Sequence, residues 1–183
     1  NGFDSNAIKI LKAKKNLRLI DGTNYTSKEL LKFVSFNQDI MIQSEDLNLF
    51  SNKNFKIVSK RKPTRKQLKD LIFAFNVCRY VKSNAIVLAS NETTVGIGTG
   101  QPSRLDSCQI AINKMKKFNL QNDNLVAASD AFFPFVDGIE KLIQSGVRAV
   151  IQPSGSIRDK EIIKFANETN TVLLFSKTRH FRH

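Results

Sequence analysis

The stretch LVAASDAFFPFVDG, residues 125–138, decides the fold prediction. It begins as an apolar strand over 125–129, continues with three phenylalanines around a proline, and enters an amphipathic helix. In α/β proteins, ligands bind beside the loops that follow the carboxyl ends of the strands. Phe132, Phe133 and Phe135 therefore form either core packing, the commoner role for any single phenylalanine, or the wall of a binding site.

Two further apolar strands follow this stretch at regular intervals. The predicted strands are 148–152 and 171–175, and the helices between the strands are 137–145 and 157–169. Apolar strands that alternate with amphipathic helices indicate parallel βαβ units in an α/β fold, with helices on both faces of the sheet. The segments after the three strands should therefore meet at one edge: SDAFFPF, QPSGS and SKTRHFRH.

Upstream of this region, the pattern predicts a helix, a hairpin and a second helix. The first helix starts at Thr64, which forms a capping box with Gln67, and runs to about residue 82. The hairpin pairs 85–90 with 94–98. The second helix covers about 103–118, with Ser103 as its N-cap.

The glycines before the second helix are a weak signal for a phosphate loop. Gly96, Gly98 and Gly100 match neither the Walker motif nor the dinucleotide fingerprint. Arg104 is more informative, because a cation in the first turn of a helix is unfavourable unless an anion offsets it. Arg104 either faces a ligand or pairs within the protein.

The first 60 residues carry weaker patterns. They predict a basic helix over 6–15, a strand over 16–20, a polar loop with a short strand near 39–43, and a strand over 55–59. We expect one main domain over residues 61–183 with an N-terminal extension over residues 1–60.

Composition sets limits on the class of protein. The 183 residues are 41% hydrophobic, and no apolar run approaches the roughly 18 residues that span a membrane. Two cysteines without metal or disulfide spacing fit a reducing cytoplasm. The chain starts at Asn1, so we expect a segment of a longer protein. The net charge of +13 reflects either a polyanion partner or a general lysine bias.

Several chemistries lack their residues in this sequence. Both histidines, His180 and His183, lie in the last four positions, so no catalytic triad can be assigned. The H-x-E and P-C-x-x-C motifs of zinc deaminases are missing, and no carboxylate cluster indicates a metal site. The remaining candidates are arginine, amide, backbone N–H and aromatic groups, which suit an anionic, planar ligand.

Two of the loops at the expected edge allow two interpretations each. QPSGS, residues 152–156, can hold a phosphate or can simply turn into the next helix, and the turn is favoured. The tail SKTRHFRH, residues 176–183, can be a frayed basic end or part of a site.

Five motifs in order give the chain a specific resemblance: KSNAIV, TVGIGTGQPSR, SDAFFPF, QPSGS and RHFRH. They resemble the bifunctional purine-biosynthesis enzymes that are AICAR formyltransferases and IMP cyclohydrolases. The resemblance implies a three-layer, cytidine-deaminase-like mixed sheet without zinc, and a homodimer with shared active sites. It also implies AICAR as substrate and 10-formyltetrahydrofolate as co-substrate, with no metal. We expect no membrane partner, and nucleic acid is the less favoured partner.

The resemblance assigns roles to individual positions. The catalytic side would be Asn84, Arg104 and His183. The nucleotide would bind Phe132, Arg179 and Phe181. The folate would lie against Leu105, Pro134, Phe135 and Asp137, which leaves Phe133 as a core residue.

The chain also departs from the family pattern. The catalytic Lys-His pair and the cyclohydrolase domain would lie upstream of Asn1, so we expect this chain to be incomplete for catalysis. Val136 stands where the family usually has arginine, and Pro102 where a longer side chain is common. A basic nucleic-acid-binding module and a catalytically silent dimerising scaffold stay open as alternatives.

Overall fold

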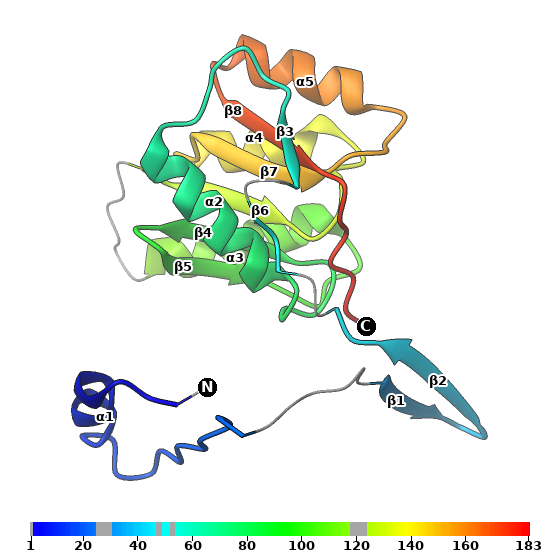
Figure 1. The fold of residues 1–183 in the computed structure, drawn as a ribbon. Coiled ribbons are helices and arrows are strands. Elements are labelled where there is room, and N and C mark those ends of the chain that lie inside the picture. Colours follow the sequence, from blue (N-terminus) through cyan, green and yellow to red (C-terminus); the bar gives the residue numbers. More distant parts are fainter. Residues whose placement is uncertain (1, 25–30, 47–48, 52–53, 118–123) are drawn as a thin grey trace. The chain divides into compact units, whose positions relative to one another are not determined.

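The computed structural model describes residues 2–24, 31–46, 49–51, 54–117 and 124–183 (Figure 1). The chain divides into two compact units, Asn1–Glu45 and Asp46–His183. The second unit contains every predicted site residue.

The second unit is built on a six-stranded mixed sheet. Its strands are β3 (Phe55–Ile57), β4 (Ile86–Ser90), β5 (Thr93–Gly98), β6 (Val126–Ser129), β7 (Ala149–Pro153) and β8 (Val172–Ser176). Their order across the sheet is β3-β8-β7-β6-β4-β5. The strands β6, β7 and β8 are parallel, and β4 pairs antiparallel with both β5 and β6. The predicted parallel units and the predicted hairpin are both confirmed.

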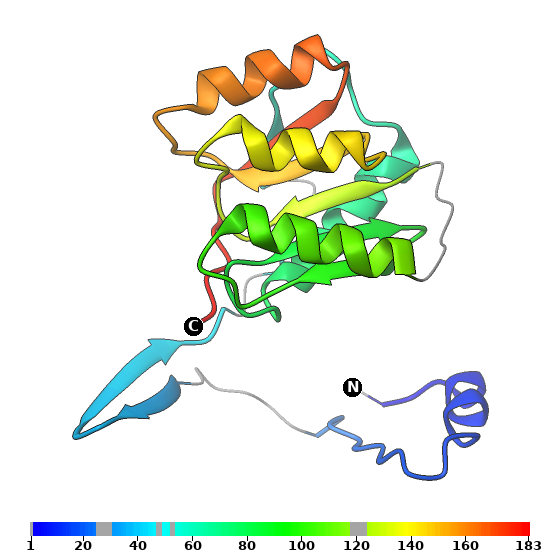
Figure 2. The ribbon, with the colours of Figure 1, turned by 180° about the vertical axis from the view of Figure 1, so that it is seen from behind.

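Helices cover both faces of this sheet, which makes three layers. Helix α2 (Arg65–Cys78) packs on β4, β6 and β7 (Figure 1). The opposite face carries α3 (Arg104–Lys117), α4 (Val136–Gln144) and α5 (Asp159–Glu168). These three helices lie in a row, green, yellow and orange, in Figure 2.

Each face of the sheet buries its own hydrophobic core. Alternate strand residues point to opposite faces, so Val87 faces α2, whereas Ile86 and Leu88 face the other helices. The α2 side contains Leu71 and Phe75. Strands that are buried on both faces need apolar residues at every position, and this explains the continuous apolar runs in the sequence.

Local signals set the ends of α2 and of the hairpin. Thr64 and Gln67 form the predicted capping box, although α2 ends at Cys78 rather than near residue 82. Asn91 and Glu92 turn the chain between β4 and β5 with positive φ angles of 54° and 52°. The buried carboxylate of Asp70 accepts from the backbone N–H groups of both turn residues, at 3.1 and 2.6 Å.

The first unit differs most from the sequence prediction. It contains α1 (Ser5–Leu11) and an antiparallel pair of β1 (Leu31–Phe36) and β2 (Asp39–Ser44). The short strand near 39–43 is confirmed, but its partner β1 was not predicted. The strand predicted over 16–20 is wrong, because a strand needs a partner for its backbone groups and these residues pair with no strand in the described part of the chain.

Candidate functional site

Five chain segments meet at one edge of the six-stranded sheet. The parallel strands β6, β7 and β8 all end there, as predicted. Because β4 is antiparallel to β6, its beginning lies at the same edge, with Ile86 opposite Ser129 and also opposite Gly98 at the end of β5. Asn84 and the start of α3 are thereby brought to the loops that follow the parallel strands.

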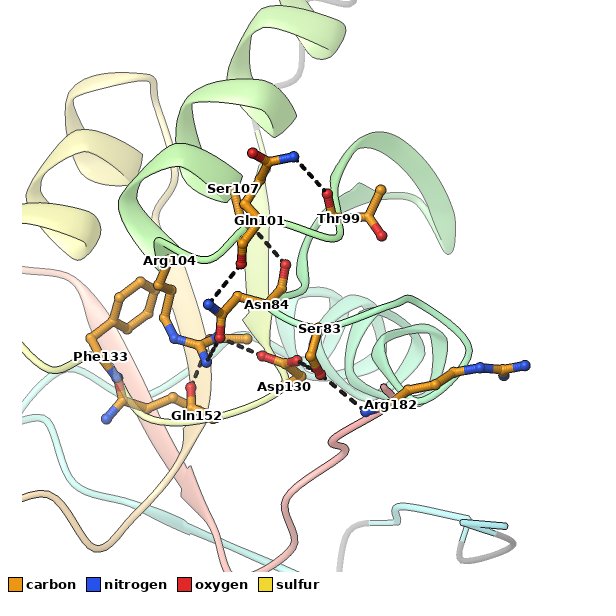
Figure 3. Close-up of polar contacts among 12 residues, drawn as sticks. Ser83, Asn84, Thr99, Gln101, Arg104, Ser107, Asp130, Phe133, Gln152 and Arg182 are labelled. Atoms are coloured by element: carbon orange, nitrogen blue, oxygen red, sulfur yellow. Dashed lines mark hydrogen bonds and ion pairs between the residues drawn. The ribbon is translucent and has the colours of Figure 1, made fainter. Parts of the chain in front are cut away.

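A buried polar network lies at this edge (Figure 3). The Arg104 guanidinium donates to Asp130 at 2.5 Å, to the Ser129 hydroxyl at 2.8 Å and to the Asn84 side-chain oxygen at 2.7 Å. Asn84 in turn donates to the backbone carbonyls of Gln101 and Pro102, each at 2.9 Å. Its side-chain direction is therefore determined by α3 and by the loop before it.

The network explains why the positive charge of Arg104 is tolerated in the first turn of α3. Its side chain is 7% exposed, and the fully buried Asp130 supplies the anion that offsets its charge. The second Asp130 oxygen accepts from Ser83 at 2.6 Å. A buried ion pair is favourable only when its remaining hydrogen-bonding groups are also satisfied, and here several of them have partners. The partner of Arg104 is within the protein, although Arg104 also lines a neighbouring cavity.

A cavity of about 430 Å³ opens beside this network. It is lined by all the predicted site residues except His183, together with five others: Pro102, Ser103, Ala131, Phe133 and Gly138. One group of lining residues comes from the loop after β6, another from the start of α3, and Arg179 and Phe181 from the tail. Segments that lie far apart in the sequence therefore form a single concave surface.

The aromatic residues of SDAFFPF have different environments. Phe133 is 1% exposed and belongs to the core, as predicted, while Phe135 is 51% exposed. The Arg179 guanidinium lies 5.2 Å from the centre of the Phe132 ring, a distance that permits a cation–π interaction. All three rings line the cavity, but Phe133 does so from within the core, whereas Phe135 is half exposed.

The glycine-rich approach to α3 has a packing explanation. A Cβ at Gly98 would lie 1.8 Å from the backbone oxygen of Ser107, and one at Gly96 would lie 2.2 Å from that of Ala111. Both glycines therefore allow α3 to lie directly on β5. This packing role agrees with the sequence, in which these glycines match neither the Walker motif nor the dinucleotide fingerprint.

The QPSGS loop is a turn into α5, as the sequence pattern favours. The Asp159 carboxylate accepts from the backbone N–H groups of Gly155 at 2.8 Å and Ser156 at 3.3 Å. Gly155 has a φ of 111°, a conformation that favours glycine. The N–H groups that could have held a phosphate are already bonded.

The tail is ordered by the body of the unit and is not a frayed end. The backbone N–H of His180 donates to the Asp130 carbonyl at 3.0 Å. Arg182 exchanges hydrogen bonds with Ser83, through its N–H at 3.0 Å and its carbonyl at 2.9 Å. His183 stacks on Phe181 with ring centres 5.8 Å apart, but it does not line the cavity.

Sequence reasoning did not assign the groups that hold Asn84 and Arg104. These are Ser83, Gln101, Ser107, Ser129 and Asp130. The sequence feature that could have identified them is the pair Ser129 and Asp130, which follows the apolar residues of β6. A carboxylate buried at the end of such a strand needs a polar or charged partner within the protein.

Neither thiol offers a reactive nucleophile. Burial raises the pKa of Cys78 well above its ordinary value, and burial raises the pKa of Cys108 to about 12. Both thiols therefore stay protonated near neutral pH. Within the described residues, no group of three or more His, Cys, Asp or Glu side chains could hold a metal ion. The same part of the chain contains no helix that is both long and apolar enough to cross a membrane.

Comparisons with known proteins give the same family that the sequence motifs resemble. The chain is 48% identical over 183 residues to the bifunctional purine biosynthesis protein PurH of Buchnera aphidicola subsp. Schizaphis graminum, and 44% identical to that of Persephonella marina. Each match covers 99% of this chain and 35% of the relative, so the chain spans about a third of their length. Residues 1–114 match the family described as AICARFT/IMPCHase bienzyme, and the chain belongs to that family.

Proposed function

We propose that this chain is the C-terminal part of an AICAR formyltransferase. The reaction transfers the formyl group of 10-formyltetrahydrofolate to the 5-amino group of AICAR, a step towards IMP in purine biosynthesis. The observation that carries the proposal is the cavity of about 430 Å³, because it is lined by the assigned nucleotide and folate residues together. A cavity of this size suits small-molecule ligands.

The charges around the cavity support an anionic nucleotide. Arg104 is already paired with Asp130, so it contributes little net charge. Arg179 forms no ion pair among the described residues and lies over the Phe132 ring. An arginine that lacks a protein carboxylate is suited to bind a phosphate group with two parallel hydrogen bonds. In this proposal Arg179 binds the phosphate, while Phe132 and Phe181 contact the base.

The other side of the cavity suits a flat, largely apolar ring. Leu105, Pro134 and Phe135 give it apolar walls, and Asp137 gives it one carboxylate. These are the residues that we assign to the folate. The Asp137 carboxylate can accept hydrogen bonds from the N–H groups of a pterin.

The reaction requires a weakly nucleophilic amine to attack a formyl carbon. Catalysis then depends on orienting the two substrates, on removing a proton and on stabilising a tetrahedral oxyanion. In this chain Asn84 would orient the nucleotide, Arg104 would hold Asn84 and provide electrostatic support, and His183 would close the site. The general base would come from a Lys-His pair outside this chain.

The resemblance extends the proposal to fold type and assembly. The mixed three-layer sheet is compatible with a cytidine-deaminase-like subdomain without zinc, in which residues 61–183 are the subdomain and residues 1–60 lead into it. We further propose a homodimer with shared active sites in the cytoplasm. The cyclohydrolase domain would belong to the part of the longer relatives that this chain does not span.

The test is formyl transfer by the full-length protein that carries this chain. We expect Asn84→Ala and Arg104→Ala to lower kcat/KM by about 100-fold or more, because both changes misplace groups at the reacting centre. Matched controls are Asn113→Ala, on the exposed face of α3, and Arg65→Ala, on the exposed start of α2. Wild-type turnover in both site variants would reject the assignment.

Binding to the 183-residue chain separates the proposal from its two alternatives. Isothermal titration calorimetry with AICAR and with 10-formylfolate should detect both ligands. A chain that dimerises but binds neither ligand is a silent scaffold. A chain that binds neither, yet binds RNA with an affinity that falls steeply with salt, is a nucleic-acid-binding module.

A further inference from the structure

Neighbouring residues of the tail face opposite directions. Arg179 and Phe181 are exposed and line the cavity. His180 lies between them and is only 1% exposed. The tail therefore presents two side chains to the proposed nucleotide and buries the one between them.

His180 is held by three separate parts of the unit. Its ring nitrogen Nδ1 pairs with the Asp46 carboxylate. Its ring centre lies 4.4 Å from that of Phe75 in α2, within the core on that face. Its backbone N–H donates at 3.0 Å to the carbonyl of Asp130, the residue whose carboxylate holds Arg104.

Packing alone does not explain a histidine at this position. A leucine could fill the space beside Phe75 without the cost of desolvating polar groups. His180 Nε2 is buried and has no hydrogen-bond partner among the described residues, so the position even carries a polar cost. What the histidine adds is a directional contact to Asp46, which determines the orientation of its ring and of the backbone on either side.

We propose that His180 is a positioning residue for the nucleotide side of the cavity. This inference rests on the proposed function. His180 does not line the cavity, so it acts through its neighbours: the contact with Asp46 directs Arg179 and Phe181 towards the ligand. The folate side should be insensitive to it, because Leu105, Pro134 and Phe135 belong to other segments.

Three substitutions in the full-length protein separate positioning from packing. His180→Ala removes the volume and the polar contact, and His180→Leu keeps the volume but removes the contact. We expect both to raise the KM for AICAR about tenfold, because a misplaced Arg179 would lose a charge-assisted hydrogen bond to the phosphate. The free energy of one such bond corresponds to roughly a tenfold change in affinity. The KM for 10-formyltetrahydrofolate should stay within about twofold. His180→Asn, whose side-chain N–H can still donate to Asp46, should recover much of the loss.

A second measurement follows the tail without relying on activity. Hydrogen–deuterium exchange detected by mass spectrometry should show faster exchange at residues 177–183 in His180→Leu and His180→Ala. The matched control is Ile162→Ala, a buried change on α5 in the opposite core. It should lower the melting temperature but leave both the tail exchange and the KM for AICAR unchanged.

The outcomes distinguish this inference from the proposed function. A wild-type KM for AICAR in His180→Leu, or an equal rise in both KM values, overturns the positioning role. Unchanged exchange of the tail in His180→Leu overturns it as well. A wild-type protein that transfers no formyl group overturns the proposed function, and this inference with it.

Discussion

Asp130 links the polar network to the tail. One of its carboxylate oxygens accepts from Arg104, the other accepts from Ser83, and its carbonyl accepts from the His180 backbone N–H. The carboxylate is fully buried. A charge in that environment is tolerated only because its partners are in place, so removing either member of the ion pair should be costly.

We expect Asp130→Ala to lower the free energy of unfolding by about 3–5 kcal/mol, because Arg104 would be left as a buried charge without its partner. Asp130→Asn should cost less, since its amide oxygen can still accept one hydrogen bond. Chemical denaturation followed by circular dichroism measures both changes.

An exposed ion pair of the same chemistry serves as the control. Arg158 and Glu161 are 3.2 Å apart, with side chains that are 47% and 58% exposed. Glu161→Ala should cost less than about 1 kcal/mol, because exposed pairs contribute little. If the two alanine variants unfold at the same denaturant concentration, the stabilising role of Asp130 is refuted.

At the scale of elements, the contact between α3 and β5 positions the site. Asn84 and Arg104 meet because the start of α3 lies beside the beginning of β4, and the Ser107 hydroxyl donates to the Asn84 carbonyl at 2.7 Å. This arrangement requires the helix to approach the strand closely. Gly96 and Gly98 leave the necessary space.

Gly98→Ala should therefore destabilise the protein by about 3 kcal/mol, because its methyl group would overlap the Ser107 carbonyl and force α3 away from β5. The same shift should weaken ligand binding. Thermal unfolding and calorimetric titration with AICAR measure the two effects.

Gly100→Ala is the matched comparison for this substitution. Gly100 has a φ of 65°, and no atom lies within 4 Å of the position that an added methyl group would take. Only the backbone conformation is therefore penalised there, by about 1–2 kcal/mol. A Gly98→Ala protein that is at least as stable as Gly100→Ala would contradict the close-approach argument.

At the scale of the whole molecule, both hydrophobic cores of the described residues belong to the second compact unit. Both hydrophobic clusters consist of residues from Phe50 onward. The first unit exposes many of its large apolar side chains, among them Phe33, Phe36 and Ile40. The second unit should therefore contribute most of the free energy of unfolding.

A fragment of residues 44–183 should fold cooperatively, with a melting temperature within about 4 °C of that of the whole chain. The physical reason is that the fragment keeps both cores and retains Asp46, the partner of His180. Thermal circular dichroism provides the measurement, and the chain of 183 residues is the control. A broad, non-cooperative transition would show that the first unit is needed for folding.

The alternation of apolar strands with amphipathic helices was enough to predict the α/β class, the parallel strands and the edge where their loops meet. These features follow from local patterns with periods of two and about 3.6 residues, together with the capping box of Thr64 and Gln67. The strand predicted over 16–20 shows the limit, because alternation alone does not supply a partner strand.

The motifs also identified most of the residues around the cavity before their arrangement was known. Only the tertiary structure decided that Arg104 pairs with Asp130, that Gly96 and Gly98 serve helix packing, and that the tail is anchored through His180. Each of these depends on residues that are far apart in the sequence or on the close approach of two elements. Local patterns do not encode such contacts, since they arise when the order of strands across the sheet brings distant segments to one edge.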